Sequence, residues 1–297
     1  LQVSWAQGQD LPEVKLDQTW REKIYGLAPE KATFPVSEKK KILVFSLHTG
    51  YEHWVIPHTE QMIKIISEKS GAFEVTGSKD ISMFEAKNLA KYDAIVLNNT
   101  CSKGDHRNLF WDKLRADSDG DSAVLMKKAL QMEENLLQYV EKGGGLLLVH
   151  GAVTTQNNSR AFSKLVGASF DYHPPQQAIQ IRLADPKHPL VQAFPATGFN
   201  HVDEPYFYKN AYADLDFKPL LYFNNAEITN QKKPLTEGKT YVAWIRAQGK
   251  GKVMYCSPSH NAQSFENPDL LRFYLNGIQY VVGDVECDET PIGKGSL

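Results

Sequence analysis

Cysteine is scarce in this chain, and clustered positive charge is missing. The 297 residues include three cysteines, Cys101, Cys256 and Cys287, whose wide separation suggests neither a disulfide framework nor a cysteine metal motif. The formal net charge is −2 and no basic block occurs, so a nucleic-acid partner is not expected. No apolar run approaches the ~20 residues that a membrane helix needs. These absences leave an ordinary globular protein with 42% hydrophobic residues.

The first ten residues, LQVSWAQGQD, are unusual. Ser4, Trp5 and Ala6 are compatible with the small-residue end of a signal peptide, although a plain unstructured N-terminus explains them equally well. We therefore expect a periplasmic or otherwise exported protein, with a cytoplasmic protein as the alternative.

Apolar segments of strand length alternate with helical patterns through the first half of the chain. This alternation predicts an α/β fold with a doubly wound, parallel sheet and right-handed crossovers. The expected strands are 41–47, 73–76, 92–98 and 146–149, and the expected helices are 59–69, 86–92 and 122–142.

The second half of the chain shows a less regular alternation of strand and helix patterns. A helix is expected at 156–166, and a hairpin with a glycine-containing turn is expected to join 241–246 to 251–257. The polar insertion 99–121 follows the third strand and predicts a lid or rim of a site. Further strands are expected at 178–183 and 218–223, and a last helix at 268–282.

The segment EKGGGLLLVHGAVTT, residues 141–155, predicts a helix end, a glycine turn, a buried strand and then a loop that opens on His150. Ligands of open α/β sheets bind just outside the carboxyl ends of the strands. His150 is therefore a candidate for chemistry, with local hydrogen bonding as the alternative role.

Polar residues also follow the other expected strands. Because parallel strands end at one edge of a sheet, several of these residues should converge on a pocket. They are His48, Tyr51 and His53 after the first strand, Asn98 to Cys101 after the third, Ser257 to Asn261 after the hairpin, and His201, Asp203, Glu204 and Tyr206 in the segment FNHVDEPYFY.

This set suggests proton transfer, with metal binding as an option. Several imidazoles and a carboxylate suit Zn or Mn, although no HExxH motif is present. We expect His48 and His53 as metal ligands, together with His150 or His260, if a divalent metal is bound. No nucleotide cofactor is expected.

Cys101 offers a different chemistry. It follows a strand and would suit a nucleophile, yet no partner base can be identified from the spacing. A buried, small apolar role is the alternative reading.

Five segments together show a resemblance to a known family. They are GYEHWVIPH, GGGLLLVHGA, DEPY, YVAWIRAQGKGKVMYCSPSHN and LNGIQYVVGD, and they resemble the ThuA-like family, named for trehalose utilisation. The resemblance covers about 41–284. It implies a class I glutamine amidotransferase-like fold, which is a flavodoxin-like, mainly parallel sheet, here with an added β-hairpin. An N-terminal arm (1–40) and a C-terminal tail (285–297) lie outside it.

At two places this chain differs from related sequences. True glutamine amidotransferases carry a Cys nucleophile in the turn where this chain has His150, Gly151 and Ala152, so a glutaminase is not expected. Many ThuA-like sequences have His-Ser-Ala at this turn, and His-Asp where this chain has His260 and Asn261.

The resemblance implies a carbohydrate-processing enzyme, a lyase or hydrolase acting on sugars or 3-keto-glycosides. A ketone at C3 acidifies the C2 proton, and a base that removes it allows the C1 oxygen to leave. The expected partner is a small carbohydrate, with a homo-oligomer left open, and the alternative function is a non-catalytic carbohydrate-binding or regulatory protein. The catalytic candidates are His150, His260 and Glu204, and the substrate-binding candidates are Tyr51, Asn98, Asp203, Tyr206, Trp244 and Asn261.

Overall fold

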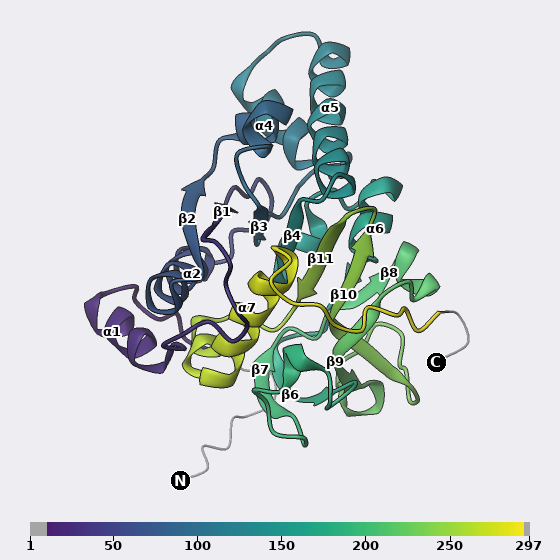
Figure 1. Cartoon of the computed structure of the whole chain (residues 1–297). Coiled ribbons are helices and arrows are strands. Elements are labelled where there is room, and N and C mark those ends of the chain that lie inside the picture. Colours follow the sequence, from purple (N-terminus) through teal and green to yellow (C-terminus); the bar gives the residue numbers. More distant parts are fainter. Residues whose placement is uncertain (1–10, 294–297) are drawn as a thin grey trace.

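The protein is built around one nine-stranded sheet with helices on both faces (Figure 1). The computed structural model describes residues 11–293. The signal-peptide-like residues Ser4, Trp5 and Ala6 lie outside this range. No helix in the described part of the chain combines the length and the apolar character that crossing a membrane would require.

The sheet has a parallel half and an antiparallel half. Its strand order is β2-β1-β3-β4-β11-β10-β9-β6-β7. The first five of these strands pair in parallel, and the remaining pairs are antiparallel. The main strands are β1 Lys40–Phe45, β2 Phe73–Ser78, β3 Ala94–Asn98, β4 Gly145–Val149, β6 Gln177–Leu183, β7 Phe199–Asp203, β9 Lys218–Asn224, β10 Lys239–Gln248 and β11 Gly251–Cys256. A second sheet pairs β5 Ser169–Tyr172 with β8 Phe207–Lys209.

The helices form two layers, one on each face of the sheet. Figure 1 shows α1, α2 and α7 gathered on one side, with α4, α5 and α6 toward the other. The α-helices are α1 Gln18–Leu27, α2 Ile56–Ser70, α3 Ala86–Leu89, α4 Leu109–Asp117, α5 Ser122–Glu141, α6 Arg160–Val166 and α7 Pro268–Val281. The 3-10 helices are η1 Ile81–Phe84, η2 His150–Thr154, η3 Pro189–Val191, η4 Asn210–Asp214, η5 Asn225–Glu227 and η6 Ala262–Glu266.

Alternation along the strands divides the core between the two faces. In β1, Ile42 and Val44 pack in the cluster that contains α2 and α7, whereas Leu43 and Phe45 pack in the cluster that contains α5 and α6. Both sets are fully buried. A strand covered on both faces reads as a continuous apolar run, because no side of it meets water.

The predicted α/β class with a flavodoxin-like sheet is confirmed, and several local predictions need correction. The insertion 99–121, for which no secondary structure was predicted, contains α4, whose first turn is capped by Asn108 through the Trp111 N–H. The helix expected at 156–166 begins at Arg160, because the Ser159 side chain accepts from the Phe162 N–H and caps it there. The added hairpin is one part of a larger antiparallel extension.

Candidate functional site

Three histidines and one glutamate meet near the carboxyl ends of the parallel strands. His53, His150, Glu204 and His260 each offer a nitrogen or oxygen atom, and these four atoms all lie within 4.8 Å of one another. His150 directly follows β4, His260 follows β11, and His53 lies in the loop between β1 and α2. We call these residues the four-residue group.

His150 is held rigidly at the centre of this group. It is fully buried and adopts a left-handed backbone conformation with φ of 47°, which is uncommon for a residue with a side chain. Its Nδ1 lies 2.8 Å from the Ser257 carbonyl oxygen. A carbonyl oxygen only accepts, so Nδ1 donates, and the Nε2 of a neutral His150 presents its lone pair to the group.

Glu204 and His260 close a triangle with that nitrogen. The Glu204 Oε2 lies 3.3 Å from His150 Nε2 and 3.2 Å from His260 Nδ1. The two histidine nitrogens are 3.3 Å apart. Three atoms that carry lone pairs therefore face one point, and they require protons or a cation between them.

Asp203 orients members of the group through hydrogen bonds. Its Oδ2 accepts from the His201 ring at 2.6 Å and from the His260 backbone N–H at 3.2 Å. Its Oδ1 accepts from the Glu204 backbone N–H at 2.7 Å. Asp203 is thus a positioning residue, because it orients the backbone of two members of the group.

Burial and neighbouring charge decide the protonation states. Burial, followed by the nearby imidazoles of His150 and His260, holds the pKa of His53 well below 6.5, so that His53 is a neutral imidazole at neutral pH. Burial alone would raise the pKa of Glu204, but the contacts of its carboxylate with the imidazoles of His150 and His260 outweigh burial and hold that pKa far below its ordinary range. Glu204 is therefore a carboxylate.

A cavity of about 260 Å³ opens beside the group. Tyr51, whose side chain is 62% exposed, lies at its rim, and its ring contacts that of His53 edge-on at 4.7 Å. Tyr206 lies deeper, with its ring centroid 4.4 Å from that of His150. Burial raises the pKa of Tyr206 well above 10, so its phenol keeps its proton. The cavity is lined by Tyr51, His53, Cys101, Ser102, Arg107, Thr154, Phe170, His173, Glu204 and Tyr206.

The predicted metal ligand His48 lies outside this group. It faces Glu52 at 3.5 Å and lines another cavity, beside α2. The cause is local. The backbone N–H groups of Thr49 and Gly50 both donate to the Cys101 carbonyl oxygen, which fixes the loop between His48 and His53.

Four predicted substrate-binding residues do not line the cavity. Asp203 has the positioning contacts described above, and the other three also have structural contacts. Asn98 donates to Ser46 and to the Ile56 carbonyl oxygen. Trp244 is fully buried in the core and donates to the Val166 carbonyl oxygen. Asn261 donates to Gln176 and to the Val202 carbonyl oxygen.

Cys101 lies next to a histidine, but its environment does not make it a nucleophile. Its Sγ lies 3.7 Å from His53 Nδ1, and it donates to the Gly151 carbonyl oxygen. Burial raises the pKa of the Cys101 thiol to about 11, so the reactive thiolate is scarce at neutral pH.

Five residues of the cavity lining were not among the sequence-based candidates: Ser102, Arg107, Thr154, Phe170 and His173. Two of them, His173 and Arg107, carry an ionisable side chain. His173 Nε2 lies 3.6 Å from Glu204 Oε1, and its ring stacks on that of Tyr206. It follows the short strand β5, which has no visible periodicity. Arg107 lies within the polar insertion, and the expectation of a lid or rim there was the signal that could have found it.

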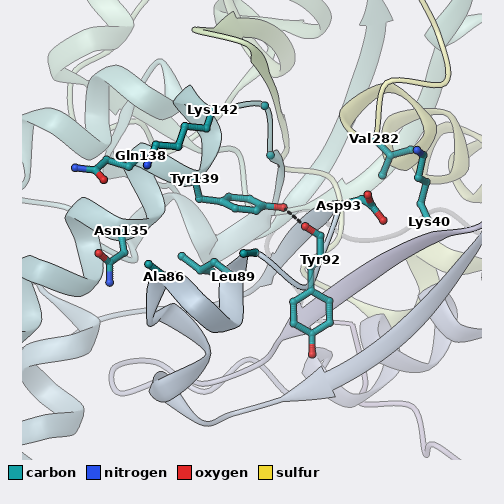
Figure 2. A pocket seen from close by; sticks show the side chains of 13 residues that line it. Lys40, Ala86, Leu89, Tyr92, Asp93, Asn135, Gln138, Tyr139, Lys142 and Val282 are labelled. Atoms are coloured by element: carbon teal, nitrogen blue, oxygen red, sulfur yellow. Dashed lines mark hydrogen bonds between the residues drawn. The ribbon is translucent and has the colours of Figure 1, made fainter.

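A larger cavity, of about 510 Å³, lies at the opposite edge of the sheet (Figure 2). It is lined by residues at the starts of β1 and β3 and near the end of α5, among them Lys40, Asp93 and Tyr139. Figure 2 shows the Tyr139 hydroxyl directed at the Tyr92 carbonyl oxygen, to which it donates at 3.1 Å. The chemistry-bearing residues are therefore at the smaller cavity, where open α/β sheets bind ligands.

Solved structures of similar fold come from several bacteria. A ThuA-like protein from Bacteroides uniformis is 19% identical, with a TM-score of 0.62 over 84% of this chain and 94% of that one. A ThuA-like protein from Parabacteroides merdae is 17% identical, with a TM-score of 0.59 over 87% and 96%. A cytoplasmic protein from Salmonella typhimurium is 14% identical, with a TM-score of 0.51 over 82% and 98%. At these identities the likeness concerns the fold alone.

Among curated proteins nothing matches this chain. The sequence pattern of one family, ThuA, described as trehalose utilisation, matches residues 41–281. That match spans all of the sheet except Lys40, the helices α2 to α7, and all four residues of the group. The chain therefore belongs to the ThuA family, whose description connects it with carbohydrate metabolism.

Proposed function

We propose that this protein is a carbohydrate-processing enzyme that acts on sugars or 3-keto-glycosides, and that the four-residue group binds a divalent metal, Zn or Mn. The observation that carries the proposal is the triangle of His150 Nε2, Glu204 Oε2 and His260 Nδ1, with edges of 3.2–3.3 Å.

The spacing of these atoms fits a metal. Ligand distances of ~2.0–2.1 Å in a tetrahedral zinc site place neighbouring ligand atoms about 3.3 Å apart. The hydrogen bond from His150 to the Ser257 carbonyl oxygen is the contact that ligating histidines usually make with their other nitrogen. His53 supplies a neutral imidazole as the fourth donor. Three imidazoles and one carboxylate suit Zn and Mn.

The chain's own residues then suit acid/base chemistry on a keto-sugar. A bound metal would supply Lewis-acid polarisation of a substrate oxygen that it accepts as an additional ligand. His173 is the imidazole most open to the cavity, with 34% of its side chain exposed, and it is suited to take the C2 proton. The Tyr206 phenol remains protonated and donates a hydrogen bond to charge that develops on the sugar. The electron pair of the C2–H bond then forms a C1=C2 double bond as the C1–O bond breaks, and the departing oxygen keeps the C1–O electron pair and takes up a proton.

Elemental analysis of the purified protein tests the metal. After incubation with Zn or Mn and removal of the excess, we expect about one equivalent in the wild type. His150→Ala should lose it, whereas His106→Ala, a change at an exposed histidine, should keep it. Absence of bound metal in the wild type under saturating Zn or Mn contradicts this part of the proposal.

Incubation with a 3-keto-glycoside tests the enzyme. Release of the aglycone by the wild type, lost in Glu204→Gln and kept in His106→Ala, supports the proposal. Tight binding of the sugar without turnover would instead identify the protein as a non-catalytic binding module.

A further inference from the structure

Arg107 lies in the cavity beside the four-residue group, and the described part of the chain supplies no hydrogen-bond or ion-pair partner for its charge. It lines the same cavity as Glu204 and His173. Its Nε is buried, and within residues 11–293 no hydrogen bond or ion pair holds its guanidinium group. A buried arginine nitrogen normally finds a carboxylate or carbonyl partner, because a buried donor without an acceptor is costly.

Glu204, the acidic residue of the cavity lining, already has partners, and so does Asp112, which lies in the same insertion as Arg107. The Glu204 carboxylate faces His150 and His260 through Oε2 and His173 through Oε1. The Asp112 carboxylate accepts from the Thr49 hydroxyl at 2.6 Å and from the Lys103 backbone N–H at 2.8 Å.

The backbone holds Arg107 in place at a conformational cost. Its φ is 47°, which residues with a side chain seldom adopt. The next two residues are anchored: Asn108 accepts from the Trp111 N–H and caps α4, and the Leu109 N–H donates to the Thr155 carbonyl oxygen at 3.1 Å. The anchored backbone therefore fixes where Arg107 enters the cavity lining.

We propose that Arg107 makes this cavity a site for an anionic carbohydrate, one that bears a carboxylate or a phosphate group. This inference rests on the proposed function and adds the substrate class to it. The guanidinium fork matches the two oxygens of either anion. The aromatic rings of Tyr51 and Tyr206 border the same cavity and frame the sugar ring. The polar insertion thus contributes the residue that selects for charge.

Calorimetric titration of the full chain with three sugars tests the inference. Glucuronate carries a carboxylate, glucose 6-phosphate carries a phosphate, and glucose carries neither. We expect the wild type to bind at least one of the anions about 10- to 100-fold more tightly than glucose, as a charge-assisted bidentate contact predicts. The anion that binds more tightly shows whether the substrate carries a carboxylate or a phosphate.

Two variants at arginine positions make the test specific. Arg107→Gln should lower the affinity for the anion to that for glucose, with its thermal midpoint showing that it folds. Arg115→Gln removes the same charge from an exposed position on α4 outside the cavity and should change nothing. Failure of the wild type to bind either anion more tightly than glucose, or unchanged anion affinity in Arg107→Gln, overturns the inference.

The outcome is separable from that of the proposed function. Anion binding that depends on Arg107, without turnover of any glycoside, would support this inference and reject the enzyme. Equal turnover of a neutral 3-keto-glycoside by the wild type and by Arg107→Gln, with no preference for the anions, would support the enzyme and reject this inference.

Discussion

Glu204 is the residue on which the charge of the site depends. It is the carboxylate of the four-residue group, and its side chain is only 13% exposed. Two imidazoles lie within 3.3 Å of its Oε2, so it serves them as an acceptor or shares a cation with them. Replacing one oxygen with an amide nitrogen removes the charge but keeps the shape.

Glu204→Gln should therefore abolish function without unfolding the protein. We expect kcat/KM on a 3-keto-glycoside to fall by about 10²-fold or more, as for loss of a group that takes part in proton transfer or charge stabilisation. Bound Zn or Mn should be lost as well. Steady-state kinetics and metal content are the measurements, and wild-type values for both would show that Glu204 has no role in catalysis.

Asp203 acts through its neighbours, so its replacement should have a different signature. In Asp203→Asn the bond to His201 and the two backbone bonds weaken. Loss of such supporting contacts typically lowers metal affinity by about 10- to 100-fold. Titration with Zn should show this shift while saturating metal restores activity. The exposed Asp119→Asn is the control; an Asp203→Asn that stays inactive at saturating metal would contradict a positioning role.

The turn from β4 into η2 is the element that builds the site. It places His150 in a left-handed conformation and follows it with Gly151. A Cβ on Gly151 would lie 2.7 Å from both the Cys101 sulfur and the His53 Cε1. The glycine therefore lets three elements approach closely, from the ends of β1, β3 and β4.

Gly151→Ala should displace His53 and destabilise the fold. Overpacking of this kind costs about 1–3 kcal/mol. Gly26→Ala is a matched control, because a Cβ there meets nothing within 4 Å and lies in α1, where alanine is favoured by up to about 1 kcal/mol. Denaturant unfolding should show opposite signs for the two variants. Equal or greater stability of Gly151→Ala would show that the turn has spare room.

At the scale of the whole molecule, the fold buries several histidines in their neutral form. His53, His58 and His188 all have a pKa lowered from 6.5, with burial as the largest cause in each case. They come from the loop after β1, from α2 and from the segment before η3. Keeping them neutral links the stability of the whole domain to pH.

The metal-free protein should lose stability as the pH falls below 6.5. Below this value the unfolded chain binds protons on these imidazoles and the folded chain does not, so acid favours unfolding. Above it the contribution is fully present. Urea unfolding between about pH 7.5 and 5, with a chelator present, measures the slope. His53→Gln should flatten it, and a wild-type midpoint that rises toward pH 5 would contradict the assignment.

Much of the fold follows from local pattern. The apolar runs of β1, β3 and β4 form buried strands that are covered on both faces, and such continuous apolar runs can be predicted from the sequence. The helix within the insertion was not predicted, because α4 is short and the flanking residues are polar and charged. Likewise, β5 and β8 are too short to show a period.

The sequence by itself determined that polar residues follow the strands, and parallel pairing then brings His53, His150 and His260 together. Only the tertiary structure decided which of them meet. His48 and His53 are separated because the loop is fixed to Cys101, a contact between distant parts of the chain. Glu204, His173 and Arg107 come from segments whose position depends on packing across the sheet edge. Strand ends are set by local periodicity, whereas the distances that make a site are set by contacts that no local pattern records.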